Sequence, residues 1–379
     1  MNTPVIVGAG TSGLSLAYYL RQQGMRPVIL EAKHAPGSAW RERHSQLRLN
    51  THRWLSGLPG KPLPRKLGAF VRCQDYIAYL EQYAHWLVEA HGVDIRYGVS
   101  VRGLCRENSR WLLDTSHGAL QAERVILATG PERVPYIPAW EGRDTTQIIQ
   151  KHAADFGNAK DYHHQRVLIV GGANSGIDVA NCLVRDGGCR SLAISMRQGT
   201  HLLPVRVLGL PTQLMAPLLT TLPLKVQDRV GAFMSRLCFG NLEKWGIRTP
   251  ELGVCSRLEL KGTAPGFDDG FVAAVKEGRI QVVPDVRRFE RHSVEFVDGQ
   301  SLTCDVVIFA TGYRSGLSQL IGHLGLVDSE GRLTASALYG SDQWPDLWVF
   351  GMRPRLVGNI CARVQEARKL AATIAHQSQ

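Results

Sequence analysis

Two glycine-rich turns carry the residue types that bind dinucleotides. The first, VGAGTSG, follows an apolar strand expected over residues 4–7, and the second, VGGANSG, follows an apolar strand over residues 167–170. Glycines in such a turn let the backbone approach a pyrophosphate, and the following helix points N–H groups at its charge. The residues expected at the two sites are Gly8, Gly10, Thr11, Ser12 and Gly13, then Gly171, Gly172, Asn174, Ser175 and Gly176. Two such turns in one chain predict two dinucleotide sites.

The residue that ends the next strand distinguishes the two sites. The strand after the first turn ends on Glu31, where a carboxylate binds ribose hydroxyls and would repel a 2′-phosphate. The first site is therefore expected to hold FAD or NAD. The strand after the second turn ends on Arg197, which suits a 2′-phosphate and predicts NADPH. Ala173 stands where the second glycine of this turn is expected, so its methyl group should push the phosphates slightly outward.

Two later strands end in the same tripeptide, Ala-Thr-Gly. The residues Thr129 and Gly130 follow the first of these strands, and Thr311 and Gly312 follow the second. We expect both turns to meet the flavin nucleotide or the crossover between domains.

The order of strands and turns predicts an α/β fold with two Rossmann-like dinucleotide-binding domains of the three-layer ββα type. We expect a FAD-binding domain over residues 1–145, completed by residues 286–379. Residues 146–285 would form an NADPH-binding domain with an inserted helical segment.

Composition excludes several other classes of protein. The eight cysteines contain no C-x-x-C, which argues against a disulfide framework, a zinc site or a dithiol redox centre, and no metal is expected. The net charge of +11 is spread along the chain, so nucleic acid is not an expected partner. The first strand starts close to the initiator methionine, and we expect a cytoplasmic protein, either a monomer or a homodimer.

One long stretch, Val207 to Leu224, carries no charged residue. Its three prolines argue against a membrane span. Ordinary core, an apolar wall over a substrate entrance, and a peripheral contact with a membrane remain open. The next segment, 225–239, predicts an amphipathic helix whose inward residues would be Val226, Val230, Phe233, Met234 and Leu237.

With these motifs in order, the chain resembles the class B flavin-dependent monooxygenases, and in particular their YUCCA-like branch. The stretches VLIVGGANSGIDVA, FGNLEKWGIRTPELG and IFATGYRS are similar to stretches in that branch at the same spacing. The resemblance implies an NADPH- and FAD-dependent monooxygenase that uses a C4a-(hydro)peroxyflavin to oxygenate a small organic substrate with O2. It places Trp40 beside the flavin and Arg197 on the 2′-phosphate. One expected reaction is oxidative decarboxylation of a 2-oxo acid such as indole-3-pyruvate.

Two departures from the family pattern leave the substrate open. The identifying sequence survives only as His152 and Phe156, and Asn50 stands where the plant proteins have histidine. Asparagine there resembles N- and S-oxidising members, in which it lies by the flavin, so Asn50 is the expected catalytic residue. N- or S-oxidation, Baeyer–Villiger chemistry, a reductase without oxygen transfer, and a non-catalytic flavoprotein therefore remain alternatives.

Overall fold

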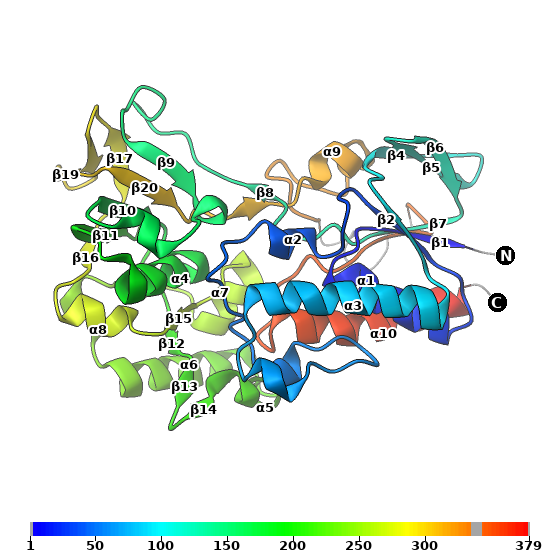
Figure 1. The fold of residues 1–379 in the computed structure, drawn as a ribbon, viewed down its shortest axis with the longest axis horizontal. Helices are drawn as coiled ribbons and strands as arrows, with labels where there is room; N and C mark the ends of the chain where they lie inside the picture. Colours follow the sequence, from blue (N-terminus) through cyan, green and yellow to red (C-terminus); the bar gives the residue numbers. More distant parts are fainter. Residues whose placement is uncertain (1–2, 335–342, 378–379) are drawn as a thin grey trace.

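Two parallel five-stranded sheets organise the chain, one in each half of the molecule (Figure 1). The computed structural model describes residues 3–334 and 343–377. The first sheet contains, in spatial order, β22 (Leu347–Val349), β7 (Arg124–Leu127), β1 (Pro4–Val7), β2 (Val28–Glu31) and β3 (Asp94–Tyr97). The second contains β16 (Gln281–Val283), β11 (Ser191–Ser195), β10 (Arg166–Val170), β20 (Val306–Phe309) and β9 (Ile149–His152).

The first sheet is covered on both faces. The helices α1 (Thr11–Gln22), α3 (Cys73–His91) and α10 (Asn359–His376) pack on one face. The antiparallel strands β4 (Val101–Glu107), β5 (Arg110–Thr115) and β6 (Gly118–Ala122) lie over the other, with α9 (Leu317–Ile321) beside them. Successive strand residues point to opposite faces, so Ile6 packs against the helices while Val5 and Val7 pack against the small sheet.

The second sheet repeats this plan. Val167 and Ile169 pack with α4 (Asn174–Cys182) and α8 (Phe271–Lys276) on one face. Leu168 and Val170 pack on the other face with β17 (Val286–Phe289) and β18 (Ser293–Phe296), to which β19 (Ser301–Thr303) pairs. Both units therefore have three layers, a small antiparallel sheet, a parallel sheet and helices, which confirms the predicted ββα fold.

The contacts of residues 286–309 favour a different domain boundary from the one expected at residues 285/286. Strands β17 and β18 bury Val286, Phe289 and Phe296 against that unit, and β20 pairs with β10 in the middle of its sheet. We propose that the second unit extends through Phe309. The first unit would then resume at the second Ala-Thr-Gly turn.

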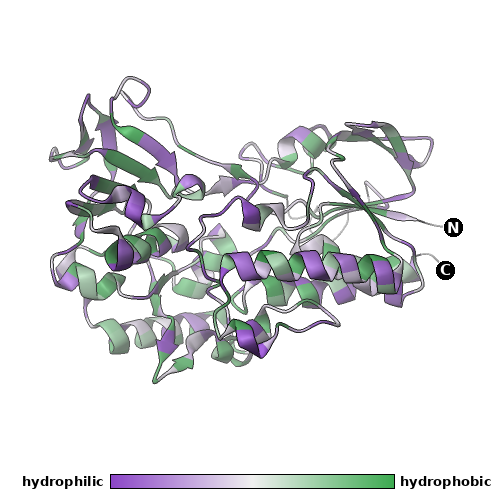
Figure 2. Cartoon of the chain, viewed as in Figure 1, coloured by the Kyte–Doolittle hydropathy of each residue, from purple (hydrophilic) through white to green (hydrophobic). Residues whose placement is uncertain are grey.

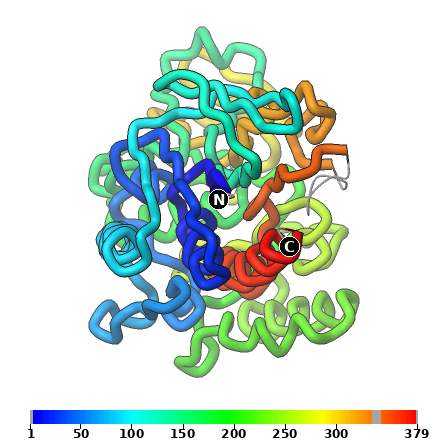
Figure 3. The backbone as a smooth tube through the Cα atoms, turned by 90° about the vertical axis from the view of Figure 1, so that its right-hand side faces the viewer, coloured from blue at the N-terminus to red at the C-terminus, as the bar shows by residue number. Residues whose placement is uncertain are grey.

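The ends of the chain meet in the first unit. In Figure 3 the blue N-terminal and red C-terminal segments run side by side. Strand β22 pairs with β7, and α10 packs on α1 through Ile360, Ala367 and Ala371. The first unit is therefore built from two segments separated by the whole second unit.

The remaining elements extend the second unit and the junction. They are α2 (Ser38–Arg41), β8 (Val134–Pro135), β12 (Leu202–Pro204), β13 (Arg206–Val207), β14 (Leu210–Pro211), α5 (Ala216–Leu219), α6 (Leu224–Phe239), α7 (Val254–Lys261), β15 (Gly266–Asp268) and β21 (Tyr313–Arg314). No helix in the described ranges is both long enough and apolar enough to cross a membrane.

The helix expected over 225–239 forms as α6, but the expectation about its inward face is wrong. Val226, Phe233 and Leu237 are exposed, and Gln227 and Gly231 are buried instead. A methyl group on Gly231 would lie 2.4 Å from a Val254 side-chain carbon, so this close approach to α7 requires the small residue. The helix therefore packs inward through Gln227, Gly231 and Phe239 and leaves Phe233 and Leu237 exposed.

Candidate active site

The first glycine turn is tightly constrained by neighbouring backbone. Gly8 has φ +112°, and a side chain on it would meet the Ala128 carbonyl oxygen at 2.7 Å. A side chain on Gly13 would meet the Gly8 carbonyl oxygen at 2.0 Å, which holds α1 close to β1. A side chain on Gly10, in contrast, would meet no atom within 4 Å. Gly8 and Gly13 therefore serve packing, while Gly10 borders open space that a pyrophosphate can enter.

The rest of the first turn fits a dinucleotide. Helix α1 has no side-chain cap and no acidic residue in its first turn, so its N-terminal N–H groups are available to an anion. The buried Glu31 carboxylate accepts hydrogen bonds from Ala9 N at 2.7 Å and Lys33 N at 3.0 Å, which fixes it over the turn. Within the described ranges the buried Thr129 hydroxyl has no partner, and Gly130 borders open space. These residues fit FAD.

Two further predicted site residues, Trp40 and Ser12, pack against other parts of the first unit. Trp40 lies on α2 and packs edge-on against Tyr76, with ring centres 4.9 Å apart. A side chain on Gly351 would meet the Ser12 hydroxyl oxygen at 2.3 Å. Gly351, which follows β22, therefore lies against the first turn. The glycine motif of residues 8–13 could not predict this contact, because Gly351 is far away in sequence.

The second turn repeats the geometry of the first. Gly171 has φ +115°, and a side chain on Gly176 would lie 1.8 Å from the Gly171 carbonyl oxygen. A side chain on Gly172 would meet Met196, the residue before Arg197. Helix α4 also starts without a side-chain cap or an acidic residue in its first turn. The donor set therefore fits a second pyrophosphate.

Ala173 occupies the position that Gly10 holds in the first turn. Its φ and ψ are −83° and −172°, against −82° and −174° at Gly10. This extended backbone accepts any residue, so alanine causes no strain. The expected outward displacement of the phosphates remains a prediction.

Arg197 is joined by a second arginine that the strand pattern could not reveal. Arg257 on α7 donates through Nη1 to the carbonyl oxygen of Gly199 at 3.3 Å, and Gly199 lies two residues after Arg197. Its burial and the nearby Arg197 charge lower the pKa of Arg257. Neither arginine forms an ion pair with any described carboxylate. Two guanidinium groups without a described carboxylate partner, one just after β11 and one on α7, would suit an anion beside the second turn.

Asn50 links the first unit to the second turn. This side chain comes from the first unit and donates through Nδ2 to Oδ1 of Asn174, the first residue of α4, at 3.4 Å. The structure thus brings together two predicted site residues that are far apart in sequence, one from each unit.

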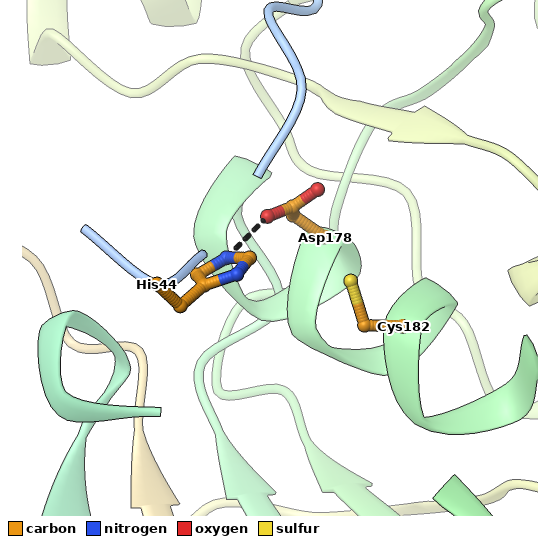
Figure 4. A group of neighbouring side chains, drawn as sticks. All are labelled: His44, Asp178 and Cys182. Carbon is orange, nitrogen blue, oxygen red and sulfur yellow. Dashed lines mark hydrogen bonds and ion pairs between the residues drawn. The ribbon is translucent and has the colours of Figure 1, made fainter. Parts of the chain in front are cut away.

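A second link between the units is a cluster of His44, Asp178 and Cys182 (Figure 4). His44 donates through Nε2 to the Asp178 carboxylate at 2.9 Å, and Asp178 and Cys182 lie one turn apart on α4. The nitrogen, oxygen and sulfur atoms lie within 4.8 Å of one another, and such ligands could coordinate a transition-metal ion. Burial, with the Asp178 charge adding, raises the pKa of the Cys182 thiol to about 12, which keeps it protonated.

We expect this cluster to act as an interdomain contact, with no metal needed. Treating the protein with a strong chelator should leave NADPH oxidation unchanged within about twofold, because a neutral buried thiol is a poor metal ligand. The measurement is the rate of NADPH oxidation before and after chelation, together with elemental analysis. Loss of activity that added zinc restores would contradict the expectation.

The second Ala-Thr-Gly turn holds the crossover between the units. Thr311 donates its hydroxyl to the Tyr136 carbonyl oxygen at 2.5 Å, and the Gly312 carbonyl oxygen accepts from Tyr136 N and from His152 Nε2, each at 3.0 Å. Burial lowers the pKa of His152. Thr311 and Gly312 therefore join the segment that leaves the second unit to the segment, through Tyr136 and His152, that enters it.

Two uncapped helix N-termini after glycine turns, on two ββα units, define a flavoprotein oxidoreductase with separate sites for a flavin and a nicotinamide dinucleotide. Residues 5–199 match the family described as pyridine nucleotide-disulphide oxidoreductase. The chain is 34% identical over 332 residues to a probable indole-3-pyruvate monooxygenase, YUCCA7, from Arabidopsis thaliana, covering 84% of this chain and 75% of that protein. It is 30% identical to the rice (Oryza sativa) indole-3-pyruvate monooxygenase YUCCA8, covering 99% and 94% of the two chains. The chain belongs to the YUCCA family of flavin-dependent monooxygenases.

Solved structures support the fold. A flavin-containing monooxygenase from Stenotrophomonas maltophilia superposes with a TM-score of 0.71 at 23% identity, covering 99% of this chain and 100% of that one. The bacillithiol disulfide reductase from Bacillus cereus superposes with a TM-score of 0.68 at 18% identity, covering 99% of each. The protein is an NADPH- and FAD-dependent monooxygenase, which confirms the predicted class and cofactors.

Proposed function

We propose that this monooxygenase oxidatively decarboxylates a small aromatic 2-oxo acid, with indole-3-pyruvate as the first candidate. One atom of O2 would enter the carboxylic acid product and the other would leave as water. The carboxyl group of the substrate would leave as CO2, and NADPH would supply the two electrons. The relatives named for indole-3-pyruvate support this substrate, since one of them aligns over 99% of the chain.

The observation that carries the proposal is the Asn50–Asn174 hydrogen bond. It links the first unit to the first residue of the helix that opens the nicotinamide site, so the two dinucleotides are expected to meet there. FAD, when bound, supplies the electron transfer from NADPH and the reaction with O2. Asn50 would then offer an amide to the reacting oxygen, while Ser175 and the α4 N-terminus hold the pyrophosphate of NADPH.

We propose that Arg197, with help from Arg257, makes the enzyme prefer NADPH over NADH by binding the 2′-phosphate. Guanidinium groups bind phosphate in a bidentate geometry that lysine does not offer. The pair lies at the end of β11, where the ribose of a dinucleotide on the second turn is expected.

The reaction is tested by supplying NADPH, O2 and one substrate at a time: indole-3-pyruvate, phenylpyruvate, a thioether or a cyclic ketone. Catalase must be present, because free peroxide decarboxylates 2-oxo acids without an enzyme. We expect one acid, shorter by one carbon, per NADPH, with label from 18O2 in its carboxylate. Sulfoxide or lactone as the main product would favour the N- or S-oxidising or Baeyer–Villiger alternatives. Peroxide alone, with every substrate, would favour a reductase.

Asn50 provides a separate prediction. Asn50→Leu should lower product formation by about 100-fold, because it removes a positioned hydrogen-bond donor. Anaerobic reduction of FAD by NADPH should change by less than about threefold, since hydride transfer does not need this amide. The two rates are measured by stopped-flow absorbance and product analysis. Equal loss of both rates would show that Asn50 only holds the domains together, and Asn50→His tests whether the residue of the plant proteins restores activity.

The cellular setting belongs to the proposal as well. We propose a cytoplasmic enzyme, monomeric or homodimeric, that makes peripheral contact with a membrane. We do not propose nucleic acid as a partner. Exposed leucine and phenylalanine side chains lie in the same segments as many of the basic residues, and such apolar side chains do not favour a phosphate backbone.

A further inference from the structure

The outer face of α6 and the segment before it expose an unusual amount of apolar surface. Half of the large hydrophobic side chains that are exposed in residues 3–334 and 343–377 lie between Leu208 and Leu237. Phe233 and Leu237 are 65% and 67% exposed, one helical turn apart on α6. Figure 2 shows hydrophobic stretches recurring along α5 and α6. Because α6 packs inward through Gln227, Gly231 and Phe239, its residues Phe233 and Leu237 face solvent in the described structure.

The hairpin of β13 and β14 projects a leucine where turns favour asparagine or glycine. Leu208 lies at the tip with φ +49°, a left-handed conformation that is strained for leucine. The side chain is 98% exposed, so it gains no burial in return. Leu210, beside it, is also exposed. An exposed apolar tip of this kind, within a larger apolar patch, is typical of a surface that contacts a partner or a membrane.

A second segment of the chain lies along the same side of the molecule. Figures 1 and 3 both show residues of the blue loop near position 60 at the lower edge, as they show the hairpin and α5. The Arg206 guanidinium stacks over the Phe70 ring at 5.1 Å, which ties the hairpin to this loop. The loop exposes Trp54. We define the α6 face as these two segments, residues 53–70 and 206–237.

The charges of the α6 face are almost all positive. Its eight basic side chains are Arg53, Lys61, Arg65, Lys66, Arg206, Lys225, Arg229 and Arg236. The face carries a single carboxylate, Asp228, which is turned inward and accepts hydrogen bonds from Cys255 N and Ser256 N of α7. None of the eight basic groups forms an ion pair with another described residue.

We propose that the α6 face binds the surface of a membrane containing anionic lipids. Leu208, Phe233 and Leu237 would enter the boundary between headgroups and acyl chains, and the surrounding lysines and arginines would meet lipid phosphates. A second copy of this chain is a poor occupant, because two faces of eight unpaired cations would repel each other. This inference goes beyond the proposed reaction and does not depend on its substrate.

The proposal is tested with the full-length FAD-bound protein and sedimentable vesicles. We expect binding to vesicles of phosphatidylcholine mixed with phosphatidylglycerol, and at least tenfold weaker binding to phosphatidylcholine alone. High salt should weaken binding to the mixed vesicles, because it screens the cationic rim. The triple variant Leu208→Ser, Phe233→Ser, Leu237→Ser should bind at least tenfold less. The charge variant Lys225→Gln, Arg229→Gln, Arg236→Gln removes three of the eight cations, so it should bind less and show a weaker salt dependence.

Matched controls separate binding from folding. Val297→Ser changes an exposed valine just after β18, outside the α6 face, and should bind vesicles like the parent protein. NADPH oxidation in the absence of vesicles should be equal in all variants, since no residue changed lies in either glycine turn. Absence of binding to mixed vesicles at low salt would overturn the proposal. A concentration-dependent dimer that the triple variant abolishes, without vesicle binding by the parent, would overturn it in favour of self-association.

Discussion

Replacing Arg197 by alanine should raise the KM for NADPH by about 10- to 100-fold, while the KM for NADH changes by less than about twofold. A hydrogen bond to a charged group contributes about 1.5–3 kcal/mol, and only NADPH carries the 2′-phosphate that would receive it. The measurement is the anaerobic rate of FAD reduction against the concentration of each nucleotide. This assay is independent of the substrate to be oxygenated.

Arg257→Ala serves as the second half of that experiment. Its guanidinium lies beside Arg197, so the variant should raise the KM for NADPH by a smaller factor, about three- to tenfold. Arg257→Lys should recover part of the effect, because it keeps the charge but not the planar fork. Arg65→Ala, on the opposite unit, is the matched control. An equal rise for NADPH and NADH in the Arg197 variant would show that this arginine does not select the phosphate.

The second large effect concerns two glycines of the first turn that look alike in sequence. Gly13→Ala should destabilise even the protein without FAD, because its methyl group would lie 2.0 Å from the Gly8 carbonyl oxygen and push α1 off the sheet. Overpacking of this kind costs about 1–3 kcal/mol, which lowers the thermal midpoint by several degrees at about 2–4 °C per kcal/mol. Differential scanning calorimetry of the FAD-free protein measures the change.

Gly10→Ala should behave in the opposite way. Its methyl group meets no protein atom within 4 Å, so the thermal midpoint of the FAD-free protein should stay the same. FAD binding should weaken by about tenfold or more, equivalent to about 1.4 kcal/mol, since the methyl group points into the space assigned to the pyrophosphate. If both variants lose stability equally without FAD, Gly10 is a packing residue and the assigned position of the pyrophosphate is wrong. Ala173→Gly, at the matching position of the second turn, should modestly strengthen NADP+ binding.

The local features of this fold were readable in the sequence because their causes are local. A strand such as 167–170, its turn and the next helix are set by apolar runs and glycines a few residues apart. The alternation of Val5, Ile6 and Val7 between two cores likewise follows from the strand period. Both ββα units and both turn geometries therefore agree with expectation.

The features that were not readable depend on contacts between distant segments. Asn50 meets Asn174 across 124 positions, and Arg257 reaches the loop after Arg197 from a separate helix. The period of α6 revealed an apolar stripe but not its direction. Gly231 decided that direction, because it lets α7 approach more closely than any larger residue would allow. The pairing of β20 with β10 is another contact that the sequence does not record, and it is the reason for the domain boundary that we propose after Phe309.

The split construction of the first unit has a consequence for how the protein is made. A ribosome completes residues 146–309, with their whole sheet, while α10 and β22 are still unsynthesised. Domains generally fold as units during synthesis. The nicotinamide-binding unit can therefore fold first, although it begins later in the chain than the flavin-binding unit. The flavin half must wait for the last helix to cover α1. FAD capture should therefore be a late, post-release event, and a nascent chain stalled before Asn359 should hold no flavin.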